Sequence, residues 1–361
     1  MHGRSESGSV QTSGDAAAPV VAAPGADMLA PRPSPRRLWP AGLAPFGRRD
    51  RTFSELGILV AWLLLAGALT VVTPRFLTES NLLNVFRQMA VVAIMSVGMC
   101  YLIISREFDL SVGSTYGLAG IGAALLVRTF GVDIWVAAPL MLLLGALVGL
   151  VNGLMVTRVG IPSFIVTLGM LSILRGVALV LATGWPVSDL PASSFFEVFG
   201  GRLFGRIPVQ TVWMLGILVV GGVVLGKTLY GYHVYATGGN PAAARLMGID
   251  TNRVKLVNFV LTATLAAFGG LIALAFLNSV TPTAGTGLEL DIIAAVVIGG
   301  TALAGGAGSI LGTFLGAAIM STVRNGLVLL GVSAYWQQAA IGLVIVIAVT
   351  LDVLGTRRRR A

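Results

Sequence analysis

The sequence predicts an all-α integral membrane protein with about ten transmembrane helices. Two features of composition lead to this prediction: 56% of the 361 residues are hydrophobic and only 11% are charged, whereas a soluble globular domain carries roughly 25% charged residues. The third feature is a succession of apolar segments near the ~20-residue length that spans a bilayer. Too few charged groups remain to cover a water-soluble surface, so we expect a chain embedded in lipid.

Residues 1–53 differ from the rest of the chain. They hold seven of the fifteen prolines and many Ala, Ser and Gly residues, without apolar periodicity. Such a stretch buries too little apolar area to offset the entropy lost on ordering, and it lacks the apolar core of roughly 7–15 residues that a secretory signal requires. We therefore predict a disordered cytoplasmic tail over 1–53 and, at the other end, a basic cytoplasmic tail over 354–361.

Apolar segments follow one another over residues 54–353, which form the predicted transmembrane domain. The third and eighth segments begin at acidic clusters and are short or interrupted by glycine, so their boundaries are the least well defined. In chain order the ten predicted spans are 55–73, 86–105, 109–127, 134–157, 162–182, 209–230, 254–278, 288–304, 308–331 and 334–353.

An even number of spans places both termini on one side of the membrane. With that side as the cytoplasm, 17 Lys and Arg residues fall inside, five fall outside and two lie within spans. Because basic residues beside spans are enriched on the cytoplasmic side, we predict the N-in, C-in orientation. The net charge of +9 is then explained by topology and does not indicate a nucleic-acid partner.

Two short motifs recur in the second half of the chain. Glu107 to Leu110 resembles Glu289 to Ile292, 182 residues later, and Asn152 to Leu154 matches Asn325 to Leu327, 173 residues later. The first acidic pair lies at the inner end of its predicted span and the second at the outer end. We therefore predict an inverted internal repeat, as in transporters with a midplane pathway.

Two loops stand out by their length. Residues 183–208 are predicted outside, as a lid or a platform for a partner. Residues 231–253 are predicted inside and carry the signals of a short helix, with Asn240 as the N-cap, Pro241 at the first helical position and Gly248 at the end. In so apolar a chain, this helix is the best candidate for contact with a soluble partner.

Glycine is abundant, with 47 residues. Pairs four residues apart favour close helix packing in lipid, where contact requires small interfaces; lining of a substrate path is the alternative interpretation. Runs at Gly299–Gly300 and 305–308 indicate a span broken into half-helices. The spaced pairs are Gly145 with Gly149, Gly222 with Gly226, and Gly312 with Gly316.

Four acidic residues lie near the ends of spans: Glu107, Asp109, Glu289 and Asp291. A charge that faces lipid is costly, so these groups are expected to face a cavity, a cation or an interface. Helix capping or pairing is the simplest interpretation, with Arg106 and Arg175 as candidate partners. Lining of a pathway and coupling to an ion or proton are the alternatives.

One motif resembles a nucleotide-binding loop but is better explained by the membrane. Gly221 to Thr228 fits G-x-x-x-x-G-K-[ST], whose phosphate-binding function needs a buried strand before it. An apolar span precedes it here, so Lys227 is interpreted as an interfacial anchor. The single Cys100 excludes a disulfide framework, and we predict no catalytic residue, metal ion or cofactor.

Four stretches resemble a known family: Tyr235 to Ile249, Gly287 to Thr301, Arg324 to Leu327 and Phe108 to Ser114. They are similar to the motifs of the ribose/xylose/arabinose-type (monosaccharide) permeases of bacterial ABC importers, and the resemblance covers about residues 54–353. The two longer stretches are specific to the wider permease family. Their detail is closer to the monosaccharide branch than to the branched-chain amino acid branch.

The resemblance implies the permease subunit of an ATP-driven monosaccharide importer in the bacterial cytoplasmic (inner) membrane, without ATPase activity of its own. It implies cytoplasmic ATPase subunits, a periplasmic or lipid-anchored sugar-binding protein and a second permease subunit in a homodimer as partners. The loop 231–253 would carry the coupling helix that docks on the ATPase, through Gly239, Asn240, Pro241, Ala243, Ala244, Arg245 and Gly248. The residues predicted to line the substrate pathway are Asp109, Ser111, Asn152, Asp291 and Asn325.

One residue departs from the family pattern, because most relatives have Gly where this chain has Glu107. The extra carboxylate weakens any transfer of sugar specificity, and a permease for another small polar solute (a branched-chain amino acid, a nucleoside or a quorum signal) is the alternative. An ion-coupled secondary transporter would need an intramembrane carboxylate and histidine relay, and a membrane enzyme would need clustered catalytic groups. The sequence contains neither pattern.

Overall fold

The computed structural model of the chain describes residues 48–333, 336–337, 339–343, 346 and 350. The predicted tails, apart from residues 48–53, and most of the tenth predicted span lie outside the described residues. The described residues from Arg49 onward belong to one compact unit.

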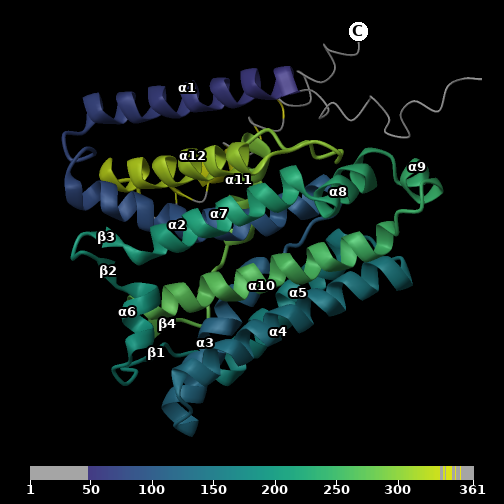
Figure 1. Cartoon of the computed structure of the whole chain (residues 1–361). Coiled ribbons are helices and arrows are strands. Elements are labelled where there is room, and N and C mark those ends of the chain that lie inside the picture. The colour runs from purple at the N-terminus through teal and green to yellow at the C-terminus, as the bar shows by residue number, and fades with distance from the viewer. Residues whose placement is uncertain (1–47, 334–335, 338, 344–345, 347–349, 351–361) are drawn as a thin grey trace, which may run out of the picture. The chain divides into compact units, whose positions relative to one another are not determined.

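The described part of the chain is almost entirely helical (Figure 1). Four two-residue strands form two antiparallel pairs, β1 (Val187–Ser188) with β4 (Ser279–Val280) and β2 (Arg202–Leu203) with β3 (Ile207–Pro208). The helices are α1 (Arg48–Val72), α2 (Glu79–Ile104), α3 (Val112–Phe130), α4 (Ile134–Leu154) with a π-helical extension (Met155–Val159), α5 (Ser163–Leu181), α6 (Ser194–Gly200), α7 (Val209–Lys227), α8 (Leu229–Gly239), α9 (Pro241–Leu246), α10 (Thr251–Leu277), α11 (Leu288–Ile298) and α12 (Ile310–Leu329).

Six helices in the described residues are long and apolar enough to cross a membrane: α1, α2, α4 with its extension, α5, α7 and α10. The helices α3 and α12, of 19 and 20 residues, occupy the third and ninth predicted spans. The prediction of a helical, multi-pass chain is therefore confirmed.

The predicted eighth span, 288–304, is shorter than expected. Its helix α11 has 11 residues and ends at Ile298, because Gly299 and Gly300 follow, the latter with a φ of +81°. A helix of this length extends about 16 Å, which is too short for a hydrocarbon core of ~30 Å. Residues 278–287 before it and 299–309 after it are mostly non-helical.

Close backbone contacts hold α10 against its neighbours. This helix contacts α2, α3 and α4. A Cβ atom on Gly145 of α4 would lie 2.7 Å from the Cβ atom of Ala267, and one on Gly98 of α2 would lie 2.6 Å from the Cα atom of Thr262. Only residues without side chains allow such an approach, so glycine positions α10 at the centre of the bundle.

The three predicted glycine pairs differ in their surroundings. Gly149 with its partner Gly145 faces α10, and Gly312 with Gly316 faces α11, so helix packing is confirmed for both pairs. For the α7 pair no close partner lies among the described residues: the nearest atom to a Cβ on Gly222 is 3.9 Å away, and nothing described lies within 4 Å of one on Gly226. Helix packing at this pair therefore stays a prediction.

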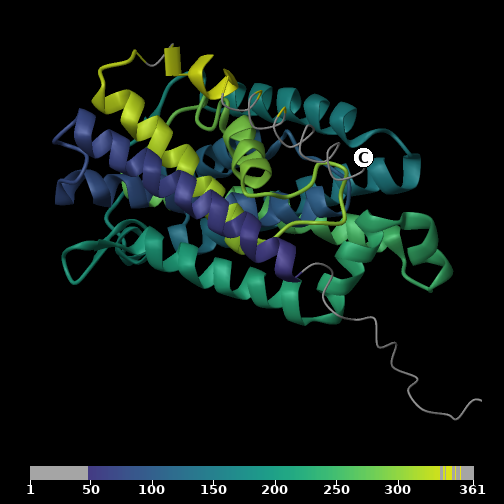
Figure 2. The same cartoon turned by 90° about the horizontal axis from the view of Figure 1, so that it is seen from above.

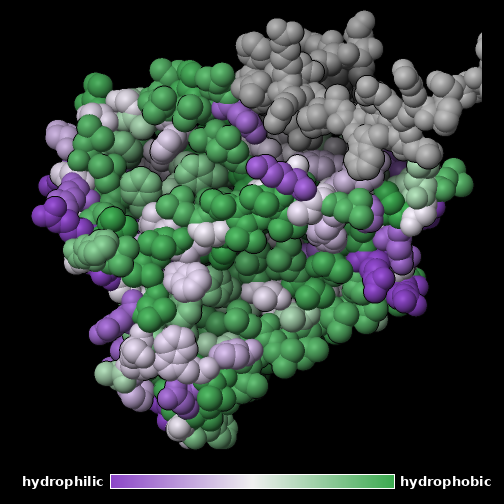
Figure 3. All heavy atoms as spheres, viewed as in Figure 1, coloured by the Kyte–Doolittle hydropathy of each residue, from purple (hydrophilic) through white to green (hydrophobic). Residues whose placement is uncertain are grey.

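The lateral surface is apolar. Figure 3 shows hydrophobic side chains over most of one face, with polar side chains gathered mainly towards two ends. The helix α1 lies beside α12 (Figure 2), where the indole nitrogen of Trp62 donates to Thr322 Oγ1 at 3.0 Å. Its other side is exposed, with Val71 86% accessible. Such an apolar surface suits a chain surrounded by lipid or by other membrane subunits.

Candidate functional site

The predicted short helix is present as α9. The Asn240 side chain accepts a hydrogen bond from the Ala243 backbone N–H at 3.1 Å, and Pro241 occupies the first helical position. Gly248 follows the helix with a φ of +83°, in the left-handed region that favours glycine. The prediction of a capped helix between Asn240 and Gly248 is therefore confirmed.

The two faces of this helical segment differ in exposure. Ala244 is only 4% exposed and belongs to the hydrophobic core, whereas Leu246 and Met247 are 89% and 81% exposed. Ala243 is exposed on the same segment, and the Arg245 Nε atom donates to Thr251 Oγ1 at 2.9 Å. The outer face thus offers apolar side chains in a position without contacts to the rest of the described chain.

Behind α9, three segments meet in a glycine-lined junction, which we define as Ser105–Phe108, Gly238–Gly239 and Gly305–Gly306. The Arg106 guanidinium donates to the carbonyl oxygens of Gly238 and Gly239, the latter at 2.8 Å. The Gly306 N–H donates to the Ile104 carbonyl at 2.8 Å. Arg106 itself has a φ of +68°, a strained conformation that this double contact holds in place.

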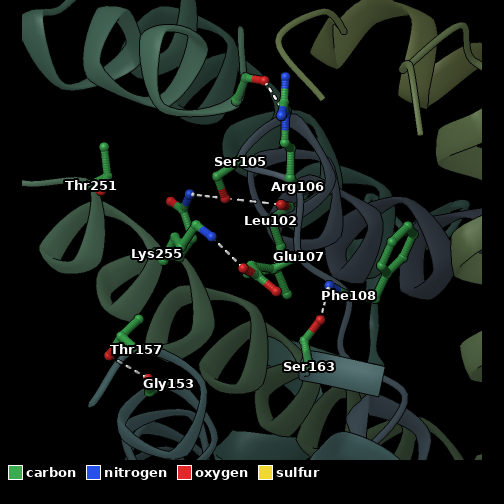
Figure 4. A network of polar contacts seen from close by, with 12 residues as sticks. Leu102, Ser105, Arg106, Glu107, Phe108, Gly153, Thr157, Ser163, Thr251 and Lys255 are labelled. Carbon is green, nitrogen blue, oxygen red and sulfur yellow. Dashed lines mark hydrogen bonds and ion pairs between the residues drawn. The ribbon is translucent and has the colours of Figure 1, made fainter. Parts of the chain in front are cut away.

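Glu107, the residue that departs from the family pattern, forms an ion pair with Lys255 of α10 (Figure 4). Next to it, the Phe108 backbone N–H donates to Ser163 Oγ at 3.4 Å. The side chains of Glu107 and Lys255 are 10% and 19% exposed, so the pair is largely shielded from solvent. The extra carboxylate therefore ties the junction to α10.

Asn258 of α10 extends the same network. Its side-chain amide donates to the Tyr101 carbonyl at 3.1 Å and to Ser105 Oγ at 3.0 Å, and it accepts from the hydroxyl of Tyr230 at 2.6 Å. The end of α2, the start of α8 and α10 are thereby joined.

Three of the predicted pathway residues lie together. Asp109 accepts hydrogen bonds from the backbone N–H and the hydroxyl of Ser111, at 2.7 and 2.5 Å. The Asn152 amide donates to Ser111 Oγ at 3.0 Å and to the other Asp109 oxygen at 3.4 Å. All three are fully buried, in the non-helical stretch before α3 and on α4. Their pathway role stays a prediction.

The other two predicted pathway residues lie on the opposite side of the bundle. Asn325 and Asn81 exchange hydrogen bonds through their side-chain amides, at 3.0 and 2.8 Å, and so join α12 to α2. Asp291 forms an ion pair with Arg324. The sequence had suggested Arg106 and Arg175 as partners of the carboxylates. Arg106 instead donates to backbone carbonyls. Arg175 donates to the carbonyls of Pro282 and Ala284, and it also has a charge–charge interaction with Glu289.

Asp291 also lines a cavity of ≈ 240 Å³ between α2, α7, α10, α11 and α12. The cavity lies near the Leu277 end of α10, whereas α9 precedes the Thr251 end (Figure 1). Sequence reasoning missed the other polar residues around it. A lone polar residue in an otherwise apolar span is the signal that identifies such positions. These residues are Arg87, Gln88, Gln210, Ser321 and Arg324.

Two further observations concern nucleotide binding and metal binding. The stretch Gly221 to Lys227 lies within helix α7, and not in a loop between a strand and a helix as phosphate binding by this motif requires. Among the residues that the structure describes, no three His, Cys, Asp or Glu side chains are placed so that they could hold a metal ion.

Comparisons of the sequence with known proteins give matches over most of the chain. Residues 81–349 match the family model described as branched-chain amino acid transport system / permease component. The chain is 44% identical over 313 residues to the ribose import permease protein RbsC of Escherichia coli K12, covering 85% of this chain and 97% of that protein.

Two other relatives are similar over nearly as much of the chain. Identity to the ribose import permease protein RbsC of Bacillus subtilis 168 is 40% over 303 residues, covering 84% of this chain and 94% of that protein. Identity to the xylose transport system permease protein XylH of E. coli K12 is 35% over 349 residues, covering 79% and 87%. No solved structure matches the chain.

Proposed function

The chain belongs to the permease-component family of the branched-chain amino acid transport system, as a multi-pass membrane permease of a bacterial ABC importer, and on this premise we propose that its solute is a monosaccharide of the ribose or xylose kind. The supporting observation is the 44% identity that extends over 97% of a ribose import permease. The family description favours a branched-chain amino acid as the second candidate.

An ABC permease works with ATPase subunits that hydrolyse ATP and with a solute-binding protein, and it is not itself an ATPase. We further propose that two copies of this chain form a homodimer. The α7 face at Gly222 and Gly226, four residues apart and without a close neighbour among the described residues, suits helix packing between subunits.

We propose the N-in, C-in topology with about ten spans, in which α11 is a half-helix. The order of elements supports an inverted repeat, because the same series of a long helix, a non-helical stretch and two further helices occurs twice. The first series is α2, 105–111, α3 and α4, and the second is α10, 278–287, α11 and α12. The helices α2 and α10 run in opposite directions through the membrane in this topology. Asn152 and Asn325 lie on the last helix of each set.

Cysteine labelling tests this topology. A cysteine in place of Ala243 on α9 is expected to react with a membrane-impermeant maleimide only after the membrane is permeabilised. A cysteine in place of Phe204, which is 87% exposed between β2 and β3, is expected to react in intact cells. The native Cys100 is fully buried, so wild-type protein supplies the background. Labelling of position 243 from outside would overturn the orientation.

The coupling role of α9 is supported by its position. Leu246 and Met247 present an exposed apolar tip, and the junction behind α9 joins it to the end of α2 and to residues 299–309. Docking of an ATPase on this tip would therefore act on segments that lead into the bundle. We propose that the predicted residues Gly239 to Gly248 form this coupling element.

Uptake measurements test solute and coupling together. In cells that contain the permease, its ATPase and its binding protein, we expect uptake of labelled D-ribose or D-xylose, whereas uptake of leucine alone would contradict the proposed solute.

Ala243→Arg is expected to lower uptake at least about ten-fold, because a bulky charge on the docking face opposes a close protein contact. Ala243→Ser is the matched control with a small side chain. Ala244 is unsuitable, since it is buried. Normal uptake by Ala243→Arg at normal abundance would exclude the coupling role.

A further inference from the structure

The cavity between α2, α7, α10, α11 and α12 carries unpaired polar atoms. Gln210 Oε1, Asp291 Oδ1, Ser321 Oγ and Arg87 Nε are buried and have no hydrogen-bond partner within the described part of the chain. Three of these residues are almost fully buried: Gln210 is 1% exposed, and Asp291 and Ser321 are each 3% exposed. Buried polar groups nearly always have partners, so a bound molecule is expected to supply them here.

The four residues come from four different helices and line one cavity. Arg87 lies on α2, Gln210 on the first turn of α7, Asp291 on α11 and Ser321 on α12. The remaining walls are largely apolar, with Val92, Ile272 and Leu288 among them. A few polar groups on an apolar wall are typical of a small-molecule site, and ≈ 240 Å³ is close to the lower end of the roughly 300–1,000 Å³ that such sites enclose.

Neighbouring contacts fix how each unpaired atom can bind. The Gln210 amide nitrogen donates to the Gly200 carbonyl at 3.2 Å, which leaves its oxygen as an acceptor. Arg324 binds one oxygen of Asp291 and leaves the other as an acceptor. The Arg87 guanidinium lies over the Phe276 ring, 4.1 Å from its centroid, and Nε remains as a donor.

Hydroxyl groups are the ligands that match this set. The cavity offers two acceptors, one donor and the Ser321 hydroxyl, which can act as either, and a sugar hydroxyl both donates and accepts. The charge of Asp291 is already paired with Arg324, which disfavours a second cation. A free amino acid would bring an ammonium group, which is such a second cation beside a carboxylate that Arg324 already pairs.

We infer that this cavity is a binding site on the permease itself for a neutral, polyhydroxylated solute of monosaccharide size. The inference rests on the proposed function, because the solute is the one the importer carries. In the proposed topology the Leu277 end of α10, where the cavity lies, is on the outer side of the membrane, so the cavity would receive the sugar after the binding protein releases it. Gln210, Ser321 and Arg87 are then solute-binding residues, together with Asp291.

Protection from labelling tests the site directly. The assembled importer is placed in lipid nanodiscs with a cysteine in place of Ala273, which lines the cavity on α10. D-ribose or D-xylose at ten times its Kd is expected to slow maleimide labelling roughly ten-fold, since only the empty fraction reacts. Labelling of a cysteine in place of the exposed Phe204 is expected to be independent of sugar.

A matched pair of variants on α7 separates solute contact from general disturbance. Gln210→Leu, made with the cysteine at position 273, is expected to raise the sugar concentration for half protection about ten-fold, through loss of a hydrogen bond. The neighbouring Thr211 also has an unpaired buried hydroxyl but does not line the cavity, so Thr211→Val should leave protection unchanged. Ser321→Ala provides a second variant, on another helix, with the same expected direction.

The outcomes distinguish this inference from the proposed function. If the unmodified importer takes up ribose or xylose but neither sugar slows labelling at position 273, or leucine protects equally well, the binding site is refuted and the proposed function stands. Equal loss of protection in Gln210→Leu and Thr211→Val would also refute it. If the unmodified importer takes up leucine and neither sugar, the proposed function fails, and this inference fails with it.

Discussion

Gly238→Ala is expected to abolish solute uptake, although it adds a single methyl group. A Cβ atom at this position would lie well under 3.0 Å from the carbonyl oxygen of Ile104 and 2.6 Å from the backbone nitrogen of Gly306. Both obstacles are main-chain atoms and cannot rotate away, so the segments of the junction must separate. The hydrogen bond from Gly306 to Ile104 and the contacts of Arg106 would be disrupted with them.

A glycine outside the junction provides the control. A Cβ atom on Gly169 of α5 would meet nothing described within 4 Å, so Gly169→Ala should support nearly normal uptake. We expect Gly238→Ala to lower both uptake and solute-stimulated ATP hydrolysis more than about ten-fold, which corresponds to 1.4 kcal/mol or more. Membrane abundance is measured in parallel by immunoblot. Equal uptake by the two variants at equal abundance would show that the junction tolerates separation.

Gly316→Ala is expected to destabilise the contact between α11 and α12. Its Cβ atom would lie well under 3.0 Å from the carbonyl oxygen of Ala295 and 2.9 Å from the backbone nitrogen of Gly299. Because α11 has only 11 residues, it has few other contacts with which to resist displacement. Overpacking of this kind typically costs about 1–3 kcal/mol.

Thermal unfolding of the purified protein in detergent measures this cost. Gly316→Ala is expected to lower the Tm by several degrees and to reduce uptake, because α11 carries Asp291. Gly176→Ala on α5 is the matched control, since nothing described lies within 4 Å of its Cβ position. An unchanged Tm for Gly316→Ala would contradict the close packing of these two helices.

The helical membrane fold and α9 could be predicted because each depends on local sequence. Low charge and apolar runs are sufficient for the spans, and the side chain of Asn240 caps a helix that begins at the next residue. The glycine pairs show where this reasoning ends. Gly149 and Gly226 have the same spacing to a partner glycine, yet only the first faces another helix closely. The spacing indicates that a helix face carries small residues, but it does not identify the helix that packs against that face.

The cavity and the ion pairs could not be predicted for a related reason. Lys255 meets Glu107 from 148 residues away, and Gln210 lines a cavity with Ser321 from a different helix. Each of these residues looks like an isolated polar group in the sequence, and only the fold brings it to its partner. The resemblance to known permeases identified motifs, but Gln210 and Ser321 lie outside all four of the stretches that carried it.

The position of α10 has a thermodynamic consequence. Its 27 residues extend about 40 Å, with Lys255 and Asn258 in the network at one end and Phe276 beside the cavity at the other. If a tilt of this helix connects the two ends, their binding equilibria are linked, and linkage is reciprocal. The factor by which ATPase docking changes the affinity for sugar must then equal the factor by which bound sugar changes the affinity for the ATPase.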